Sequence, residues 1–388
     1  EEGEAARQEM RALTQAARLR EDGDLRALLV RHVGQPFGLG ERLVSFWTDH
    51  FTVRGLGGVQ QFAGPAYAAD AIRPHVMGRF ADMARAVLRE PVMLLYLDQA
   101  YSSGPNSRAA KRREGRGLNE NLARELLELH TLGVDGRYTQ GDVFELAKLL
   151  AGLSTGPRAP FLFRRNLIEP GAEEVLGQRY AGDDLAAVDA AIEDLARHPD
   201  TARHLARKLA THFVADAPDA ALITHVAARY SASDGDLGET TAALLEHPAA
   251  WDTAAGNVKW PLDYLTSSLR ALGLSVDAVA AFGPRDLRRH FRAPLGRMGQ
   301  PWHRPPDPAG WEEADAHWIT PQAVAERVTW AMQVPGRLLN GALPDARALL
   351  ALVAADRGTP ELTFAVSASE NQREGVGLVL ASPTFQRR

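Results

Sequence analysis

The sequence contains no cysteine among its 388 residues. Disulfides and thiolate metal ligands are therefore excluded, and a bacterial cytoplasm or a periplasm would suit the chain equally well. Long apolar runs are also lacking, since none approaches the roughly 18 residues that a membrane-spanning helix needs. We expect no membrane span. The first residues, Glu1 to Glu4, show no signal-peptide pattern, which leaves an export signal that has been removed as an open alternative.

Positive charge is not in excess either. The chain carries 44 Lys and Arg residues against 49 Asp and Glu residues, and its formal net charge is −5. A nucleic-acid-binding domain normally presents a basic surface. We therefore expect no DNA or RNA partner.

Hydrophobic residues make up 45% of the chain, and Leu and Ala dominate over β-branched runs. This composition favours helices. We predict a mainly α fold, a multi-helix bundle-like globular protein. A helical amino-terminal half (1–156) would hold the site, a β-hairpin connection (157–182) would follow, and a second helical half (183–388) would complete the chain. A single continuous domain is the alternative.

Local signals predict several elements. Two short apolar segments flank the turn at 169–171 and predict a β hairpin near residues 160–177. Residues 1–33 predict two helices that are joined at Gly23. Thr139 and Asp142 match a capping box for a helix over 141–152. His198 and His247 each precede a proline and are interpreted as caps at helix joints.

The stretch 119–133 predicts a helix that ends near Gly133. Helical periodicity places Glu125 inside its apolar stripe, so this carboxylate is expected to be desolvated. A buried carboxylate needs a partner, a proton or a metal, and the nearest partners in sequence are Arg124, Asn121 and His130. A purely structural polar network is the alternative interpretation.

Other candidates lie elsewhere in the chain. His50 falls on an aromatic helix face, where a histidine is more often a core residue than a ligand. Lys208 shares a helix face with His212.

A proline-rich loop over 294–321 carries three tryptophans, which either pack in the core or stack on planar groups such as sugar rings: Trp302, Trp311 and Trp318. The basic segment 107–117 is either a mobile loop or a flap that favours an anionic ligand.

Several motifs together resemble a bacterial family catalogued as domain of unknown function 1800. They extend over almost the whole chain: residues 46–51 (Phe-Trp-Thr-Asp-His-Phe), 119–133 (Asn-Glu-Asn-Leu-Ala-Arg-Glu-Leu-Leu-Glu-Leu-His-Thr-Leu-Gly), 138–143, 176–177, 208–209, Lys259 with Pro261, 308–311 and 382–386. The resemblance implies a largely helical protein but no particular activity. It also implies export, hence a periplasmic or secreted location, and a sulfatase-like protein as partner. One departure is Ile168, where the family pattern has His.

Three functions follow as hypotheses. The first is a hydrolase or lyase that acts on a glycan or another anionic polymer. In it, Glu125 would be the carboxyl group with a raised pKa, Glu128 or Glu120 its ionised counterpart, His50 or His130 a proton shuttle and Arg124 the group that orients one acid. Asn121, Lys208, Trp302, Trp311 and Trp318 would bind substrate.

The second hypothesis is a scaffold or binding protein without catalysis. The third is a divalent metal held by His50, Glu125, Glu128 and His130, but their spacing matches neither the Glu-x-x-His of di-iron bundles nor His-Glu-x-x-His. We therefore predict no metal and no cofactor.

Overall fold

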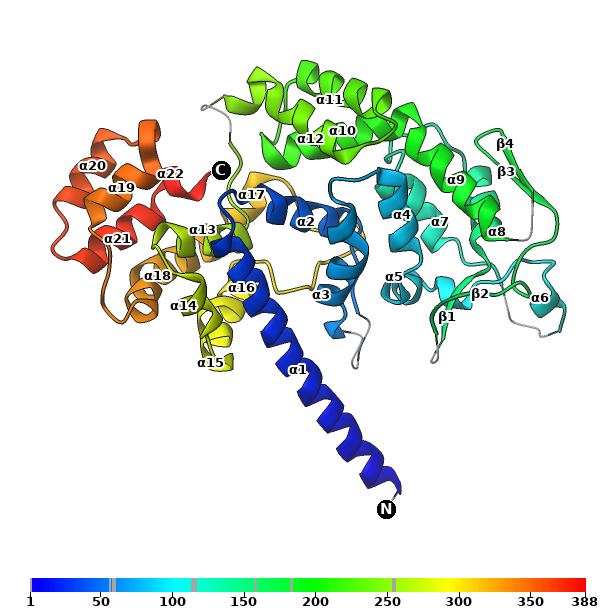
Figure 1. Cartoon of the computed structure of the whole chain (residues 1–388), viewed down its shortest axis with the longest axis horizontal. Coiled ribbons are helices and arrows are strands. Elements are labelled where there is room, and N and C mark those ends of the chain that lie inside the picture. The colour runs from blue at the N-terminus through cyan, green and yellow to red at the C-terminus, as the bar shows by residue number, and fades with distance from the viewer. Residues whose placement is uncertain are drawn as a thin grey trace.

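The computed structural model describes residues 2–55, 57, 61–112, 117–156, 159–181, 184–252 and 256–388. It is mainly helical, as predicted, and its only β structure in these ranges is two small antiparallel hairpins and a few isolated bridges. Figure 1 shows an elongated body from which the first half of α1 projects. Within the described residues, no helix is both long and apolar enough to cross a membrane.

The elements that precede the strands form the centre and one end of the body. They are α1 (Glu2–Gly34), α2 (Leu39–His50), α3 (Gly64–Tyr67), η2 (Ala68–Ile72), η3 (Arg73–His75), α4 (Phe80–Leu88), α5 (Pro91–Tyr96), η4 (Gln99–Tyr101), α6 (Arg108–Arg112), α7 (Asn121–Glu125), η5 (Leu126–His130) and α8 (Gln140–Leu150).

The elements after the strands arch over this centre and then form the other end of the body (Figure 1). They are α9 (Leu185–Arg197), α10 (Pro199–Phe213), α11 (Ala220–Ala232), α12 (Leu237–Glu246), η6 (Pro248–Trp251), α13 (Pro261–Ala271), α14 (Val276–Ala280), α15 (Pro284–Leu287), η7 (Arg288–Arg292), α16 (Ala293–Arg297), α17 (Asp315–Trp318), α18 (Pro321–Leu338), α19 (Ala346–Ala354), η8 (Ala355–Arg357), α20 (Pro360–Ser367), α21 (Gln372–Ala381) and α22 (Pro383–Gln386).

Apolar side chains gather in two large clusters. The first core contains buried residues between Leu43 and Leu244. The second core joins Leu25 and Leu29 of α1 to residues between Tyr264 and Phe385. A small tryptophan cluster (Val258, Trp260 and Trp318, with Trp311 packed against it) is separate from both.

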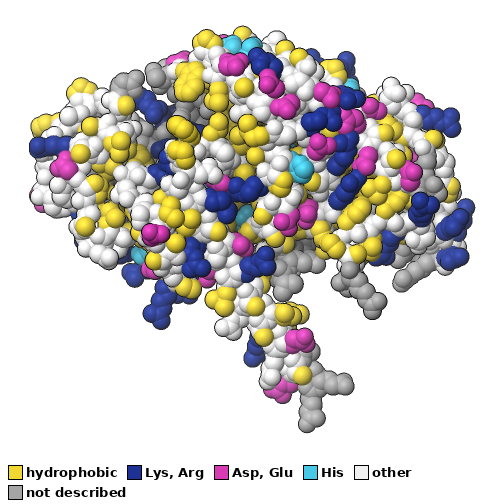
Figure 2. Space-filling model, viewed as in Figure 1, with side chains coloured by type: hydrophobic (Ala, Val, Ile, Leu, Met, Phe, Trp, Pro, Cys, Tyr) yellow, Lys and Arg dark blue, Asp and Glu magenta, His cyan; other side chains and the backbone are white. Residues whose placement is uncertain are grey.

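The predicted break in the first helix is wrong, because α1 runs without interruption through Gly23. Glycine inside a helix costs about 1 kcal/mol relative to alanine. Tertiary contacts outweigh this cost: Leu25 and Leu29 are fully buried, and Asp22 forms an ion pair with Arg292. The other half of α1 is solvated, and Met10, Leu13 and Leu19 are each about half exposed on it (Figure 2).

The predicted β region is correct, but the predicted strand pairing is wrong. β1 (Leu153–Gly156) pairs with β2 (Ala159–Phe163), and β3 (Ala172–Val175) pairs with β4 (Gln178–Ala181). Leu176 and Gly177, which join β3 to β4, have φ values of 54° and 75°. Two left-handed residues close a tight two-residue hairpin, so β3 pairs with the strand that follows it.

The predicted caps are confirmed. Thr139 and Asp142 form a capping box at the start of α8. His198 ends α9 and accepts a hydrogen bond from the Asp200 amide at the start of α10, and His247 caps η6 in the same way. The basic segment is helical over α6, whereas residues 113–116 lie outside the described residues.

The predicted helix over 119–133 is confirmed as α7 and η5 together. It begins at Asn121, whose amide donates to Asn119 Oδ1 over 2.8 Å. From Leu126 to His130 it widens into a π turn. Such turns are rare in proteins and frequently occur at functional sites. Gly133, with φ of +87°, follows the end of the helix.

Candidate functional site

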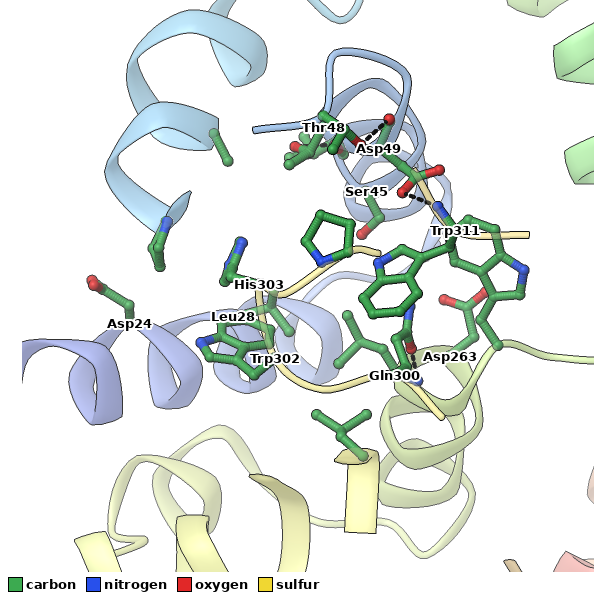
Figure 3. Close-up of a pocket in the computed structure, with 18 of the residues that line it drawn as sticks. Asp24, Leu28, Ser45, Thr48, Asp49, Asp263, Gln300, Trp302, His303 and Trp311 are labelled. Carbon is green, nitrogen blue, oxygen red and sulfur yellow. Dashed lines mark hydrogen bonds between the residues drawn. The ribbon is translucent and has the colours of Figure 1, made fainter. Parts of the chain in front are cut away.

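A cavity of about 190 Å³ lies between the two cores. Its wall comes from segments far apart in sequence: the carboxy-terminal half of α1, the α2 helix, η2, the start of α13 and the loop 298–314. Figure 3 shows side chains from these elements converging on one space. The cavity combines apolar and aromatic surface with a few polar groups, which is the composition of ligand sites in proteins.

Asp49 stands near the end of α2, on the wall of the cavity. Neighbouring residues Phe46 and Trp47 are buried in the first core, and this packing fixes the rotation of the helix. Asp49 Oδ1 accepts a hydrogen bond of 2.9 Å from the Trp311 amide (Figure 3). A Cβ atom at Gly310, where φ is +90°, would lie 2.6 Å from Asp49 Oδ2. Only glycine therefore lets the loop close on this carboxyl group.

Burial raises the pKa of Asp49 to about 8. Lys208 opposes the shift by its positive charge, whereas Glu313 adds to it. A carboxylic acid with this pKa keeps most of its proton at neutral pH. Asp49 can therefore donate a proton to a ligand in the cavity.

Asp263 on α13 lines the same cavity but has the opposite protonation state at neutral pH. Its Oδ2 lies 2.5 Å from Arg388 Nη1. Burial alone would raise the pKa of Asp263, but the guanidinium groups of Arg388 and Arg42 outweigh burial and lower it to about 2. Asp49 and Asp263, two of the carboxyl groups of the cavity wall, thus have opposite protonation states at neutral pH.

Trp302 and His303 form another part of the wall, together with Leu28 and Asp24 of α1 (Figure 3). The indole and imidazole rings meet edge to face, with centroids 4.2 Å apart. His303 has φ of +48°, a conformation that costs a non-glycine residue on the order of 1 kcal/mol and is enriched at functional sites. Burial lowers the pKa of His303 to about 4, so its ring is uncharged at neutral pH.

A buried polar network lies behind Asp49. His212 is 2% exposed, and its Nδ1 lies 3.0 Å from Glu313 Oε1. Burial raises the pKa of Glu313 to about 7 and lowers that of Lys208. Since the charge of Lys208 acts on both Asp49 and Glu313, these residues respond to one another electrostatically.

The acidic residues predicted on the 119–133 helix are not in the cavity wall. Glu125 is half-buried, and burial followed by repulsion from Glu128 raises its pKa, in line with the expected desolvation. Of the candidate partners Arg124, Asn121 and His130, Arg124 acts on Glu125 by its positive charge, which opposes the rise in pKa. Arg124 pairs with Glu120 at 3.0 Å and with Glu128 at 3.6 Å, and Asn121 is exposed. A catalytic role for Glu120, Glu125 and Glu128 stays a prediction.

His50 and His130 are brought together, as two candidates of one site require. Their ring centroids are 5.8 Å apart, and His50 Nε2 lies 3.1 Å from the His130 carbonyl oxygen. Both are fully buried among aromatic rings, and burial lowers both pKa values, that of His130 to about 3. Neither lines the cavity, which fits the interpretation of His50 as a core residue.

Some of the substrate-binding candidates line the cavity, and others lie behind its wall. Trp302 and Trp311 line the cavity. Trp318 is fully buried and packs against Trp260, so it supports the wall from behind. Lys208 likewise acts from behind the wall, through Asp49.

Sequence analysis missed Asp49, Asp263 and His303 of the cavity wall. Asp49 lies inside the 46–51 motif, and its place in that motif is a signal that could have identified it. Asp263 follows the Lys259 and Pro261 signal by two residues, and nothing in its local sequence distinguishes it from a first-turn helix acid. In the described part of the chain, no group of three or more His, Asp or Glu residues could hold a metal ion.

Comparison with known proteins agrees with the motifs. No curated protein and no solved structure is similar enough to count as a match. The model of one family, described as "Protein of unknown function (DUF1800)", matches residues 3–387. This match covers essentially the whole chain, and the protein belongs to the DUF1800 family.

Proposed function

We propose that the protein is an acid–base enzyme, a hydrolase or lyase, and that the cavity is its active site for one unit of a glycan. The observation that supports this most is the pair of cavity carboxyl groups with opposite protonation, Asp49 and Asp263. Acid–base catalysis at neutral pH requires two groups whose pKa values are driven apart by their surroundings. Trp302 and Trp311 supply aromatic faces for a sugar ring.

The protonation state of each carboxyl group determines its role in catalysis. In hydrolysis, the Asp49 carboxyl group donates its proton to the oxygen of the leaving group. The Asp263 carboxylate stabilises the positive charge that develops on the ring. Ionised Asp49 then accepts a proton from the attacking water, which restores the acid. Positioned general acids of this kind contribute about 10²- to 10⁴-fold in rate.

The test begins with release of nitrophenol from a panel of nitrophenyl glycosides and with cleavage of oligosaccharides, each measured between pH 4 and pH 9. We expect kcat/KM to fall as pH rises through about 8, because Asp49 then loses its proton. Asp49→Asn should lower kcat/KM by about 10²- to 10⁴-fold and remove the alkaline limb of the profile.

Asp135→Asn is the matched control, because Asp135 is an exposed aspartate outside the cavity wall. It should leave the rate and the pH profile unchanged. Unchanged turnover in Asp49→Asn would overturn the assignment of the acid. Absence of turnover on every member of the panel would overturn the glycan enzyme and favour the scaffold protein.

Export to the periplasm and association with a sulfatase-like protein belong to the same proposal. They rest on the family resemblance. Fractionation of cells that produce the protein from its full gene tests the location, and co-purification from that fraction tests the partner. Recovery in the cytoplasm would contradict the first, and recovery without a sulfatase-like protein would contradict the second.

A further inference from the structure

The arginines at the α1 side of the cavity are already occupied. Arg73 binds Glu41 through two hydrogen bonds of 2.6 and 2.9 Å, and Arg31 binds the same carboxylate at 3.3 Å. The Glu41 side chain is 1% exposed. A two-point contact between guanidinium and carboxylate is a strong, oriented interaction. Arg73 is therefore held by Glu41, and Arg31 shares that carboxylate through one longer contact, so a carboxylate or phosphate of a ligand would have to compete with Glu41 for either guanidinium group.

The acid on the α13 side is occupied in the same way. Asp263 pairs with Arg388, and both side chains are mostly buried, with exposed fractions of 14% and 5%. Arg388 Nη2 also donates to the His212 carbonyl oxygen over 2.8 Å. This pair is neutral overall, so it does not compensate a permanent charge on a bound ligand.

Three other titratable groups of the wall are uncharged at neutral pH. Asp49 holds its proton at neutral pH, and burial keeps His303 and His212 neutral. Burial raises the pKa of Asp24, and the positive charges of Arg20 and Arg31 oppose this shift. A charged ligand beside these uncharged groups would leave its charge unpaired, which costs several kcal/mol when the charge is buried.

Uncharged hydrogen-bonding groups complete the wall. Ser45 and Thr48 donate their hydroxyl protons to carbonyl oxygens of α2, which leaves oxygen lone pairs as acceptors. Gln300 uses its Oε1 to accept from the Leu262 amide over 2.9 Å. That hydrogen bond orients the amide group of Gln300 and leaves its NH₂ as a donor.

We infer that the cavity selects an uncharged, hydroxyl-rich ring of monosaccharide size, stacked on Trp311, over acidic or amino sugars. The inference rests on the proposed function, because it names the substrate class of the same cavity. The volume of about 190 Å³ is smaller than the roughly 300 Å³ at which sites for drug-sized ligands begin, so it suits one ring.

The experiment is a binding titration at pH 7 with ligand-observed NMR. The probes are methyl glycosides of glucose, galactose and mannose, the methyl glycosides of the matching uronic acids, and those of the matching amino sugars. We expect at least one neutral glycoside to bind 10-fold or more tightly than its acidic and amino counterparts. Trp311→Ala should abolish this binding. Trp251→Ala, which removes a tryptophan that is 67% exposed and outside the wall, should retain it.

A variant that gains binding of an acidic sugar tests whether charge, rather than shape, excludes that sugar from the cavity. Glu41→Gln releases Arg31 and Arg73 from their shared carboxylate, so this variant should bind the uronic-acid glycoside at least 10-fold more tightly than the original chain does. A melting curve confirms that the variant is folded. Asp24→Asn, which removes a wall acid without releasing an arginine from Glu41, is a second variant for the same titration and should gain less.

Three results would overturn the inference: tighter binding of an acidic or amino sugar by the original chain, no binding of any neutral glycoside, or retained binding in Trp311→Ala. None of these binding results bears on the proposed acid–base chemistry, which is tested by turnover in Asp49→Asn. Conversely, Asp49→Asn should still bind the neutral glycoside, so failure of the chemistry leaves the binding result intact.

Discussion

At the scale of single residues, burial rather than residue type determines what the ionisable groups can do. Asp49 and Asp263 are chemically identical, yet one is protonated and the other ionised at neutral pH. Burial raises the pKa of both, and their neighbours make the difference: Arg388 and Arg42 outweigh burial at Asp263, whereas Lys208 and the Trp311 amide only partly oppose it at Asp49. Histidines show the same effect, since burial keeps His50, His130 and His303 neutral.

The raised pKa of Asp49 predicts how stability depends on pH. The folded protein keeps the Asp49 proton up to about pH 8, whereas the unfolded chain loses it near pH 3.8. The contribution of this group to stability is therefore complete below about pH 4 and is lost as pH rises toward 8. Asparagine does not titrate, so Asp49→Asn should become more stable relative to the original chain by on the order of 4 kcal/mol between pH 5 and pH 8.

Urea denaturation at the two pH values measures this difference. Glu313 titrates in both proteins, so most of its own contribution to the pH dependence cancels in the comparison. Asp135→Asn, the exposed control, should show a difference that does not change with pH. A constant difference for Asp49→Asn as well would contradict the shifted pKa.

At the scale of elements, the site depends on how a loop meets a helix end. The loop 298–314 contributes Gln300, Trp302, His303 and Trp311 to the cavity wall. Its position relative to α2 is set by the approach of Gly310 and Trp311 to Asp49. Prolines at 301, 305, 306 and 308 restrict the backbone of this loop before it folds, which lowers the entropy lost when the loop is ordered.

Substitution of Gly310 tests this contact. Gly310→Ala would bring a methyl group to 2.6 Å from Asp49 Oδ2, so the loop must move away from the carboxyl group. We expect turnover or glycoside binding to fall 10-fold or more. Gly341→Ala is the matched control, because Gly341 also has a positive φ, 85°, but no atom lies within 4 Å of its added Cβ.

Both variants should lose roughly 1 kcal/mol from backbone strain alone, measured as a lower melting temperature. Only Gly310→Ala should lose function. Equal loss of function in the two variants would mean that strain, rather than the approach to Asp49, sets the activity.

At the scale of the whole molecule, α1 connects the two cores. Leu25 and Leu29 pack into the second core, whereas Arg31 reaches Glu41 on α2. The cavity lies where these two attachments meet. The relative placement of the cores therefore decides the geometry of the site.

Leu29→Ala should reduce the free energy of unfolding by about 2–5 kcal/mol, because it opens a cavity at a fully buried position. Leu19→Ala is the control on the same helix, since Leu19 is 58% exposed, and should change stability by less than about 0.5 kcal/mol. Urea denaturation followed by tryptophan fluorescence measures both. Equal effects of the two substitutions would contradict the boundary between the packed and solvated halves of α1.

The sequence by itself determined the helical class, the caps at Thr139, His198 and His247, the buried aromatic position of His50 and the family. Each of these depends on residues within a few positions of one another or on motif identity. It also identified Trp302 and Trp311 as candidates, because tryptophans among prolines stand out in any single sequence.

Only the tertiary structure decided the rest. Gly23 lies within an unbroken helix because distant residues bury Leu25 and Leu29, and β3 pairs with β4 because its turn has two left-handed residues. The cavity joins Asp49 to Trp311 and Asp263 to Arg388, pairs separated by more than 100 residues. A pKa depends on burial and on neighbouring charges in space, so the chemistry of the two aspartates follows from the fold and not from the local sequence.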